Sequence, residues 1–360
     1  MNPFSFKATR PDLRRALAGT LVFLALSLGA CTESSTKDAE FYVFGTLVEV
    51  KLAGVDDDLA SDAFGELQLA LQKMHRDWHP WEPGRLTAIN RAFAVGEPAR
   101  ADQDIITLIH VAQEFEIKTG GRFNAAIGRL VSMWGFHTSQ FPIVGPIPRP
   151  GEIQAVVGRH PSALDIEIHG DTVANPSRAV QLDFSGLAKG YAVDQACHIL
   201  HSLGIDNALI GAGGDLRGFG KRGDRPWRIA IRNPLGGVIG TIEIQGDESV
   251  FTSGNYERFH LDDHQERYPH ILDPRTGWPT RDIMSATVIT HEGVRADAAA
   301  TALVVAGIED WENVAAPLGI SEVLITDERG QIFATRPMLD RVSLSAGLKA
   351  HVIGRTESGT

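Results

Sequence analysis

The sequence predicts one large α+β domain, built from mixed and antiparallel strands with packed helices, behind an N-terminal export signal. Strand-like alternation and helical spacing both occur along the chain, and the second half is rich in short strands. No internal repeat and no low-complexity linker divides the 360 residues, which favours one domain over two. We place this domain at residues 41–350 and expect a polar tail at residues 351–360.

Hydrophobic periodicity gives the elements in order. Apolar residues alternate with others over residues 41–52, which predicts one strand, and helical spacing follows at residues 59–74 and 105–115. Two further helices are predicted at residues 190–203 and 296–305. Short β-rich runs, bounded by Gly, Pro, Asn and Asp, are found at residues 179–184, 207–210, 227–232, 237–244, 285–290, 322–326 and 331–335.

The first thirty residues have the pattern of a secretory signal peptide. Four basic residues precede an Ala/Leu-rich stretch that ends in small residues directly before Cys31. Leu28-Gly29-Ala30-Cys31 has the form of a bacterial lipobox, in which Cys31 would be lipidated, although a plain cleaved signal with an incidental cysteine is the alternative. We expect residues 31–40 to be a flexible tether, and the protein to be held by lipid in the bacterial periplasm, with the inner membrane favoured.

Composition narrows the possible partners. Cys197 is the only cysteine besides Cys31, so the sequence offers no disulfide framework. The formal net charge is −11, and removal of residues 1–30 takes away four basic residues and one acidic residue, leaving 30 Lys+Arg, 44 Asp+Glu and a charge of −14. This acidity argues against a nucleic-acid partner. A nucleotide site would need local help from a cation or from oriented backbone amides.

The generic nucleotide-binding motifs are absent from the sequence. The run Gly211-Ala212-Gly213-Gly214-Asp215-Leu216 starts like a dinucleotide fingerprint, but Leu216 stands where the third glycine is needed. Neither Lys189 nor Lys221 has the glycine spacing of a Walker A loop. We interpret the glycine run as a tight strand connection.

Asp297 and Thr301 are a candidate metal-binding pair. They are four residues apart on a predicted helix, so their side chains project from one face, one turn apart. A carboxylate and a hydroxyl offer hard oxygens of the kind that Mg²⁺ prefers. The alternative is that Asp297 caps the helix and Thr301 bonds to its own backbone.

Two further segments carry candidate chemistry. Residues 182–194 run from a strand end through small residues into a helix, where backbone amides favour an anion and Lys189 lies within reach. Residues 268–277 read as a strand that closes into a Pro/Gly turn, and His270 there could act as a general base. Taken alone, Lys189 could be a surface lysine and His270 a histidine without a catalytic role.

Together these segments resemble the ApbE family of FAD:protein FMN transferases along nearly the whole mature chain. No single segment is diagnostic, but their order and number make the resemblance specific. The matching segments are Phe44-Gly45-Thr46, Trp78, Leu86 to Asn90, Thr119 to Asn124, Trp134-Gly135-Phe136, Asp183 to Asp194, Gly213-Gly214-Asp215, Thr252 to Tyr256, His270 to Pro279, and Ala296-Asp297 with Thr301. The resemblance implies a single T-fold-like domain.

The resemblance also implies a set of site residues. The Mg²⁺ ligands would be Asp297, Thr301 and a backbone carbonyl at Gly186, and His270 would be the catalytic base. FAD would contact Phe44, Trp78, Arg122, Phe123, Asn124, Asp183, Lys189 and Ile271. Trp78 could stack on a flavin or adenine ring, with core packing as its alternative role, and Lys189 would offset the charge of the diphosphate.

The reaction implied by the resemblance is phosphoryl transfer from FAD to a partner protein. A Ser or Thr hydroxyl of an exported redox subunit would attack the FMN-side phosphorus, and AMP would leave with its charge held by Mg²⁺. A periplasmic FAD pyrophosphatase and a lipoprotein that binds FAD without cleaving it are the alternatives. The chain departs from the family at Asn124-Ala125-Ala126, where Asp-Pro/Thr is common, and at Phe44, where Met is usual. Because both positions are expected flavin contacts, the resemblance does not predict the shape of the flavin pocket.

Overall fold

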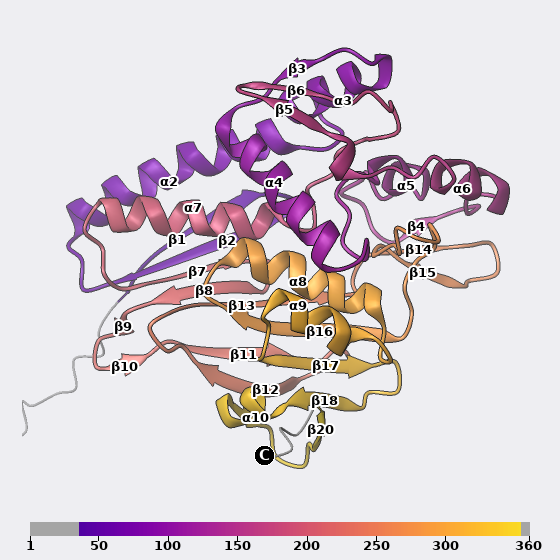
Figure 1. Cartoon of the computed structure of the whole chain (residues 1–360). Helices are drawn as coiled ribbons and strands as arrows, with labels where there is room; N and C mark the ends of the chain where they lie inside the picture. Colours follow the sequence, from indigo (N-terminus) through magenta and orange to yellow (C-terminus); the bar gives the residue numbers. More distant parts are fainter. Residues whose placement is uncertain (1–35, 354–360) are drawn as a thin grey trace, which may run out of the picture. The chain divides into compact units, whose positions relative to one another are not determined.

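A nine-stranded sheet forms the centre of the domain (Figure 1). The computed structural model describes residues 36–353, so the predicted signal peptide and Cys31 lie outside the described residues. The strand order is β1-β2-β7-β8-β13-β16-β17-β18-β20, and neighbouring strands are antiparallel except for the β18–β20 pair. The prediction of an α+β fold with mixed sheets is confirmed.

The elements have the following bounds. The helices are α2 Asp57–Trp78, α3 Arg85–Val95, α4 Gln103–Lys118, α5 Gly128–Met133, α6 Pro150–Val157, the 3₁₀ turn η1 Ala163–Asp165, α7 Ala188–Ser202, α8 Gly293–Ala306, α9 Trp311–Leu318 and α10 Arg336–Arg341. The strands of the large sheet are β1 Thr36–Val43, β2 Thr46–Ala53, β7 Ala208–Ala212, β8 Asp215–Phe219, β13 Asp247–Gly254, β16 Ile283–Thr290, β17 Val323–Asp327, β18 Ile332–Thr335 and β20 Ala350–Ile353. The smaller sheets contain β3 Ala99–Arg100, β4 Ile143–Val144, β5 Glu167–His169, β6 Thr172–Ala174, β9 Lys221–Arg222, β10 Arg225–Pro226, β11 Arg228–Arg232, β12 Val238–Glu243, β14 Phe259–Leu261, β15 Arg267–Pro269 and β19 Val342–Leu344.

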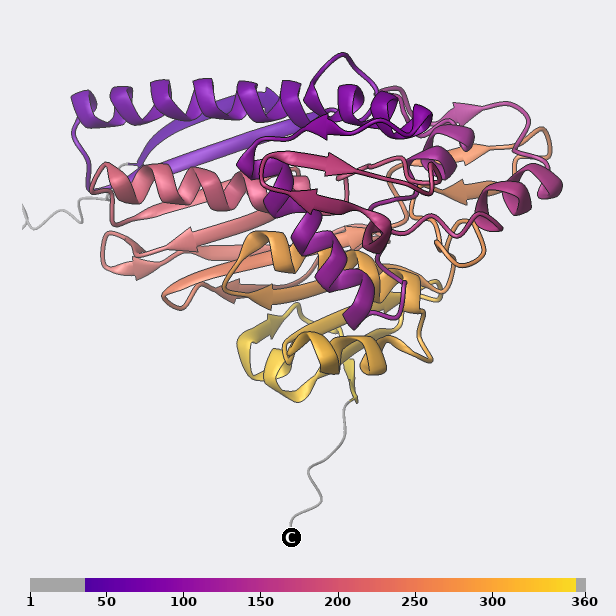
Figure 2. The same ribbon diagram turned by 45° about the horizontal axis from the view of Figure 1, so that its top comes forward.

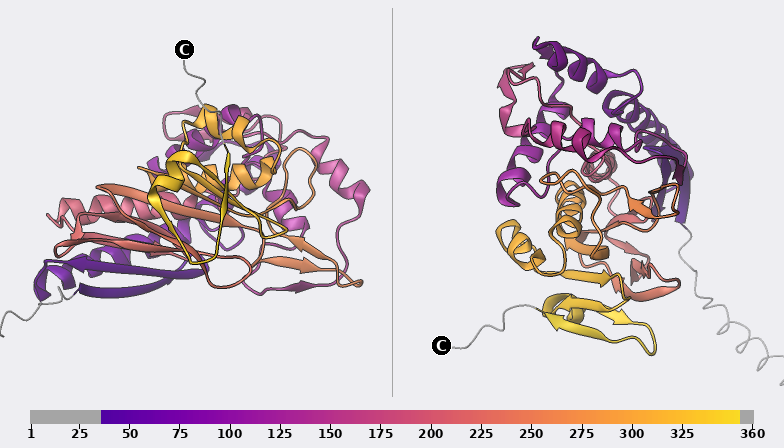
Figure 3. Two further views of the ribbon diagram at one scale, coloured as in Figure 1. Left: turned by 90° about the horizontal axis from the view of Figure 1, so that it is seen from below. Right: turned by 90° about the vertical axis from the view of Figure 1, so that its right-hand side faces the viewer.

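The large sheet is covered on both faces, by helices on one side and by a small sheet on the other. Helices α2, α7 and α8 pack with apolar residues of the large sheet in the main core, and Figure 2 shows α2 and α7 side by side. The second core joins the large sheet to β11, β12 and β19. Strand β13 is shared between the two, since Val250 belongs to the second core and Phe251 to the first. β1 and β20 lie at opposite edges of the large sheet (Figure 3).

The N-terminal strand differs from the prediction in two ways. The predicted single strand over residues 41–52 is a hairpin, in which β1 pairs with β2 around a two-residue turn at Phe44 and Gly45. Both turn residues have positive φ angles, 55° and 66°, as the tight turns of hairpins require. The predicted tether is also too long, because residues 36–40 already hydrogen-bond to β2 as part of β1. At the other end, residues 351–353 of the predicted tail belong to β20.

The run at residues 179–184 is extended but is not a strand of any sheet. Leu182 exchanges hydrogen bonds with the side chain of Asn90, and the amide of Asp183 donates to the carbonyl of Ala125. These partners are a side chain of α3 and the loop at Ala125, and Gln181 forms only an isolated bridge to Ile127, which corrects the predicted strand. The glycine run at Gly213 and Gly214 is the tight turn between β7 and β8, as predicted. No helix within residues 36–353 combines the length and the apolar character that crossing a bilayer requires.

Helices α7 and α8 cross in backbone contact, and two glycines permit it. A Cβ atom on Gly190 would lie 2.2 Å from the carbonyl oxygen of Gly293, and a Cβ on Gly293 would lie 2.8 Å from the carbonyl oxygen of Gly190. Neither distance can be accommodated without movement of the helices. The crossing brings the first turn of α7 against the first turns of α8.

A buried acid fixes the start of α8 at this crossing. Asp194 of α7 accepts hydrogen bonds from the backbone amides of Gly293 and Val294, at 2.7 and 2.9 Å. The same carboxylate pairs with the buried guanidinium of Arg217, which also binds Asp247. A carboxylate at a helix N-terminus accepts hydrogen bonds from free backbone amides and interacts favourably with the positive end of the helix dipole. Asp194 therefore fixes the position of the start of α8 relative to α7.

We predict that Gly190→Ala destabilises the protein by about 1–3 kcal/mol or more, because the added methyl group overpacks the crossing. Gly65→Ala is the matched control, since Gly65 lies inside α2 and an added Cβ meets no atom within 4 Å. That control should gain up to about 1 kcal/mol from the higher helix propensity of alanine. Urea unfolding of both variants measures the effect, and equal stability of Gly190→Ala and the parent protein would contradict the prediction.

Candidate active site

One cavity of about 830 Å³ contains all twelve predicted site residues among its lining residues. They come from the β1–β2 turn, α2, the loops after α4 and before α7, α7 itself, the loop after β15, and α8. A volume of this size is within the range of ligand-binding pockets. The structure thus brings together segments that are far apart in the sequence, while the role of each residue stays a prediction.

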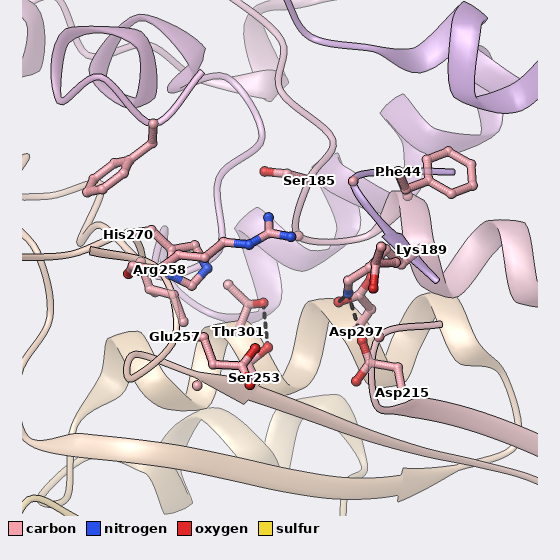
Figure 4. A pocket seen from close by; sticks show the side chains of 18 of the residues that line it. Phe44, Ser185, Lys189, Asp215, Ser253, Glu257, Arg258, His270, Asp297 and Thr301 are labelled. Atoms are coloured by element: carbon pink, nitrogen blue, oxygen red, sulfur yellow. Dashed lines mark hydrogen bonds and ion pairs between the residues drawn. The ribbon is translucent and has the colours of Figure 1, made fainter. Parts of the chain in front are cut away.

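An acidic cluster lies at the α7–α8 crossing, on one side of the cavity (Figure 4). The ammonium group of Lys189 donates to Asp215 at 2.8 Å and to Asp297 at 3.0 Å. The other oxygen of Asp297 accepts from the backbone amide of Gly190 at 3.0 Å, in the first turn of α7. Asp215 also accepts from the backbone amide of Thr252 at 2.8 Å. When both acids are ionised, the cluster carries one net negative charge.

The pKa directions follow from this geometry. Burial alone would lower the pKa of Lys189, but Asp215 and Asp297 outweigh it and hold that pKa above its ordinary value. Burial raises the pKa of Asp215 to about 6, with Asp297 adding to the rise and Lys189 opposing it. Two acids so close together favour a cation between or beside them.

The structure shows which groups Lys189 contacts, and its predicted contact with FAD stays a prediction. Its charge is met by two carboxylates, so in this arrangement it is not an unpaired cation beside the cavity. The sequence predicts an anion at the N-terminus of α7, and the carboxylate of Asp297 occupies such a position, because it accepts a hydrogen bond from the backbone amide of Gly190. Lys189 and the helix amide hold Asp297 in place.

Thr301 and Gly186 lie next to each other beside this cluster. The hydroxyl of Thr301 is hydrogen-bonded to the hydroxyl of Ser253 at 2.9 Å, and a Cβ on Gly186 would lie 3.6 Å from the oxygen of Thr301. Asp297 is one helical turn before Thr301 on α8, and its side chain is only 3% exposed. The predicted ligands thus supply a carboxylate, a hydroxyl and a nearby backbone.

The donor chemistry of these residues fits a magnesium ion. Hard oxygen donors and a net negative charge are what Mg²⁺ requires, and it usually keeps positions for water and for substrate phosphate. Within residues 36–353, no group of three or more His, Cys, Asp and Glu side chains is arranged to hold a metal ion. A cation here would accordingly depend on hydroxyl, backbone and substrate oxygens besides Asp297.

His270 lies on the opposite side of the cavity from the acidic cluster (Figure 4). Its Nδ1 is 3.2 Å from the backbone carbonyl of Arg258, which can only accept, so Nδ1 carries the proton and Nε2 has a free lone pair. Burial lowers the pKa of His270 to about 4, and the positive charge of Arg258 contributes. The imidazole is therefore neutral at pH 7, as a general base must be.

The aromatic wall of the cavity is more tightly packed than predicted. The Trp78 ring is stacked with Phe44 at a centroid distance of 6.2 Å and also contacts Tyr191. Only 2% of Trp78 is exposed, so its alternative role as a core residue is the one that the packing supports. Phe44 is half-buried against it, and its backbone amide donates to the ring nitrogen of His75 at 3.1 Å. Of these two predicted aromatic contacts, Phe44 is therefore the one with surface open to a ligand.

The polar groups of two predicted flavin contacts are already engaged. The guanidinium of Arg122 pairs with Asp310, and the amide group of Asn124 donates to the carbonyl of Pro161 while its oxygen accepts from the amide of Ala126. These bonds shape the loop, and neighbouring Phe123 is buried. Ile271 is also buried, beside the base, where it lines the cavity.

Asp183 is buried and fully hydrogen-bonded. Its carboxylate accepts from His137 at 3.0 Å and from the backbone amide of Ser185 at 2.9 Å. Burial raises the pKa of Asp183, but these hydrogen bonds outweigh it and leave the pKa below its ordinary value. The carboxylate is thus held ionised and fixes the loop that carries Gly186.

Sequence reasoning missed three residues of the site. Asp215, Ser253 and Arg258 all line the cavity, and each contacts a predicted site residue directly. Each lies within or beside a segment that resembles the family, but its partners are distant in the sequence. The signal that could have found Asp215 and Ser253 is their place in the segments Gly213-Gly214-Asp215 and Thr252 to Tyr256, which resemble the family.

A neutral histidine and an acidic cluster that face each other across a cavity of this volume form the kind of site that a group-transfer enzyme uses. Comparison with known proteins identifies the class. The ApbE family model matches residues 44–325. A FAD:protein FMN transferase of Rhodobacter capsulatus is 40% identical over 349 residues, which are 95% of this chain and 66% of that protein. One of Haemophilus influenzae is 28% identical over 87% of this chain and 93% of its own length.

Solved structures agree with this assignment. The ApbE protein of Thermotoga maritima has a TM-score of 0.77 at 29% identity, with 85% of this chain and 99% of that chain covered. The flavinyl transferase ApbE of Pseudomonas stutzeri has a TM-score of 0.75 at 26% identity, with 87% and 98% covered. The chain belongs to the ApbE family and is an FAD:protein FMN transferase.

The pKa of His270 can be measured directly. We predict that its imidazole titrates at about pH 4, so that the base is lost only as the pH falls through that value. NMR titration of ring-labelled histidine provides the measurement, and the His270→Gln variant assigns the signal. A midpoint near the ordinary value of about 6.5 would contradict this prediction.

Proposed function

We propose that the chain transfers the FMN half of FAD to a Ser or Thr hydroxyl of an exported protein, with a bound Mg²⁺ ion and with release of AMP. The observation that carries the proposal is the shared cavity, in which a neutral base faces an acidic cluster with oxygen donors. The transferase class is the one to which its relatives belong. The hydroxyl acceptor, the metal and the compartment are the parts that experiments must test.

Asp297, Thr301 and the backbone at Gly186 would hold the magnesium ion. When bound, Mg²⁺ would neutralise charge on the diphosphate and on departing AMP. The carboxylate of Asp297 is already oriented, because Lys189 donates to one of its oxygens and the Gly190 amide donates to the other. Ser253 orients the hydroxyl of Thr301.

His270 would act on the acceptor. Its Nδ1 proton is held by the carbonyl of Arg258, so Nε2 takes the proton of the acceptor hydroxyl. The hydroxyl oxygen then forms a bond to the FMN-side phosphorus, and the bond from that phosphorus to the oxygen of AMP breaks. AMP leaves with the electron pair of that bond. Because the histidine is neutral, the base needs no prior deprotonation at pH 7.

Export and lipid attachment complete the proposal. The signal pattern at residues 1–30 and the lipobox at Cys31 support a periplasmic enzyme tethered to a membrane, with the inner membrane favoured. The described domain begins at β1, five residues after Cys31, so such a lipid would hold the fold close to the membrane surface. Exported redox subunits at that membrane would be accessible acceptors.

Incubation with FAD, Mg²⁺ and a domain that carries the acceptor motif tests the activity. We expect the acceptor to gain the mass of one FMN and AMP to appear in equal amount, because a single phosphorus–oxygen bond is exchanged. Mass spectrometry measures the first product and chromatography the second. Rapid release of FMN and AMP without acceptor would show a pyrophosphatase instead, and intact FAD on a stable yellow protein would show a binding protein.

The Asp297→Asn variant tests the metal site. The amide keeps the shape of the carboxylate but removes its charge, so the Mg²⁺ concentration for half-maximal transfer should rise about tenfold to a hundredfold. Asp340→Asn is the matched control, since Asp340 is an exposed acid of α10 paired with Arg336. Circular dichroism checks that both variants fold. An unchanged Mg²⁺ dependence in Asp297→Asn would exclude this residue as a ligand.

A further inference from the structure

Four cationic side chains line the cavity within residues 36–353, and three of them already have carboxylate partners. Arg122 pairs with Asp310, Lys189 pairs with Asp215 and Asp297, and Arg232 pairs with Glu257. The fourth is Arg258, and no described carboxylate forms an ion pair with its guanidinium. Among the described residues, Arg258 is therefore the cavity-lining cation whose charge is available to an anionic ligand.

The position of Arg258 is defined by contacts from several sides. It follows β13 in the loop that leads to β14, and its backbone carbonyl accepts both the amide and the Nδ1 proton of His270. Its guanidinium lies over the ring of Phe141, 5.6 Å from the centroid. Its Nη2 atom is 4.0 Å from the place where a Cβ of Gly45 would stand, next to Phe44. The side chain thus reaches from the base toward the β1–β2 turn (Figure 4).

The donors of this guanidinium are not used within the described chain. Its five N–H groups form a planar fork that matches two oxygens of a phosphate, and no described acceptor takes a hydrogen bond from them. The contact with Phe141 holds the plane without consuming these donors. In the proposed reaction the attacked phosphorus lies near the base, so a guanidinium next to His270 would face it.

We propose that Arg258 binds the FMN-side phosphoryl group of FAD, the group that is transferred, while its backbone carbonyl fixes the proton of His270. This inference rests on the proposed function, since it assigns the phosphate cation for that reaction. It replaces Lys189, whose charge is neutralised, with a side chain from the loop of the base. One residue thereby links the position of the base to the position of the phosphorus.

Binding measurements separate this role from a structural one. Arg258→Gln should weaken binding of FAD about tenfold to a hundredfold, the effect of losing a charge-assisted hydrogen bond, and should leave binding of riboflavin unchanged because riboflavin has no phosphate. Arg258→Lys should lie between, since it keeps the charge without the planar fork. Arg228→Gln is the control, because Arg228 is exposed on β11 and bonds to Thr241.

Fluorescence titration with FAD and with riboflavin gives these dissociation constants. An equal loss for both ligands would overturn the proposal, because it would mean that the pocket itself had changed, and so would equal FAD affinity in Arg258→Gln and the parent protein. Transfer of FMN by the parent protein is assayed separately. Arg258-dependent FAD binding without any transfer would leave the phosphate contact standing and would overturn the proposed reaction.

Discussion

The backbone contact between Gly190 and Gly293 determines where the acidic cluster can form. Because the two helices touch without intervening side chains, Asp297 of α8 reaches the first turn of α7, where the amide of Gly190 and the ammonium of Lys189 hold it. Asp194 fixes the same crossing from the other side by capping α8. A larger residue at either glycine would separate the helices and move Asp297 from its partners. The site is thus a consequence of close packing in the core.

Charge placement follows from this constraint. The chain is acidic, and three of its four cavity-lining cations within residues 36–353 are paired with acids. The cavity therefore does not present a large surface of unpaired positive charge. The two carboxylates of Asp215 and Asp297 carry more negative charge than Lys189 neutralises, so a further cation would be favoured there. Arg258 lies elsewhere in the cavity, beside His270. An anionic diphosphate would lie between a bound cation and an arginine, with the neutral base at one end. The division of charge explains how an acidic protein can bind a dinucleotide.

Local sequence patterns predicted the elements that depend on one periodicity. The helix predicted at residues 190–203 is α7, Ala188–Ser202, whose buried positions recur at helical spacing. The one predicted at residues 296–305 lies within α8, Gly293–Ala306, which is buried at most of its positions. The hairpin was missed because a two-residue turn at Phe44 and Gly45 does not interrupt the alternation of the flanking strands. The run at residues 179–184 resembles a strand in its side chains, but its backbone hydrogen bonds go to the side chain of Asn90 on α3 and to the loop at Ala125.

The site was predictable as a set of residues, and its internal pairings were not. Family resemblance selected twelve residues that all line one cavity. It could not show that Lys189 is neutralised, since its partners Asp215 and Asp297 are 26 and 108 residues away, or that Trp78 is covered by Phe44 and Tyr191. Such contacts depend on how the sheet and the helices pack in three dimensions.

A crystal structure with FAD and Mn²⁺ tests the central claim most directly, because the anomalous signal of manganese locates the ion independently of any assumed ligand. Our account predicts one manganese peak within coordination distance of the side chains of Asp297 and Thr301 and of an oxygen of the FAD diphosphate. A peak elsewhere, or FAD bound with its diphosphate away from the α7–α8 crossing, would contradict the account.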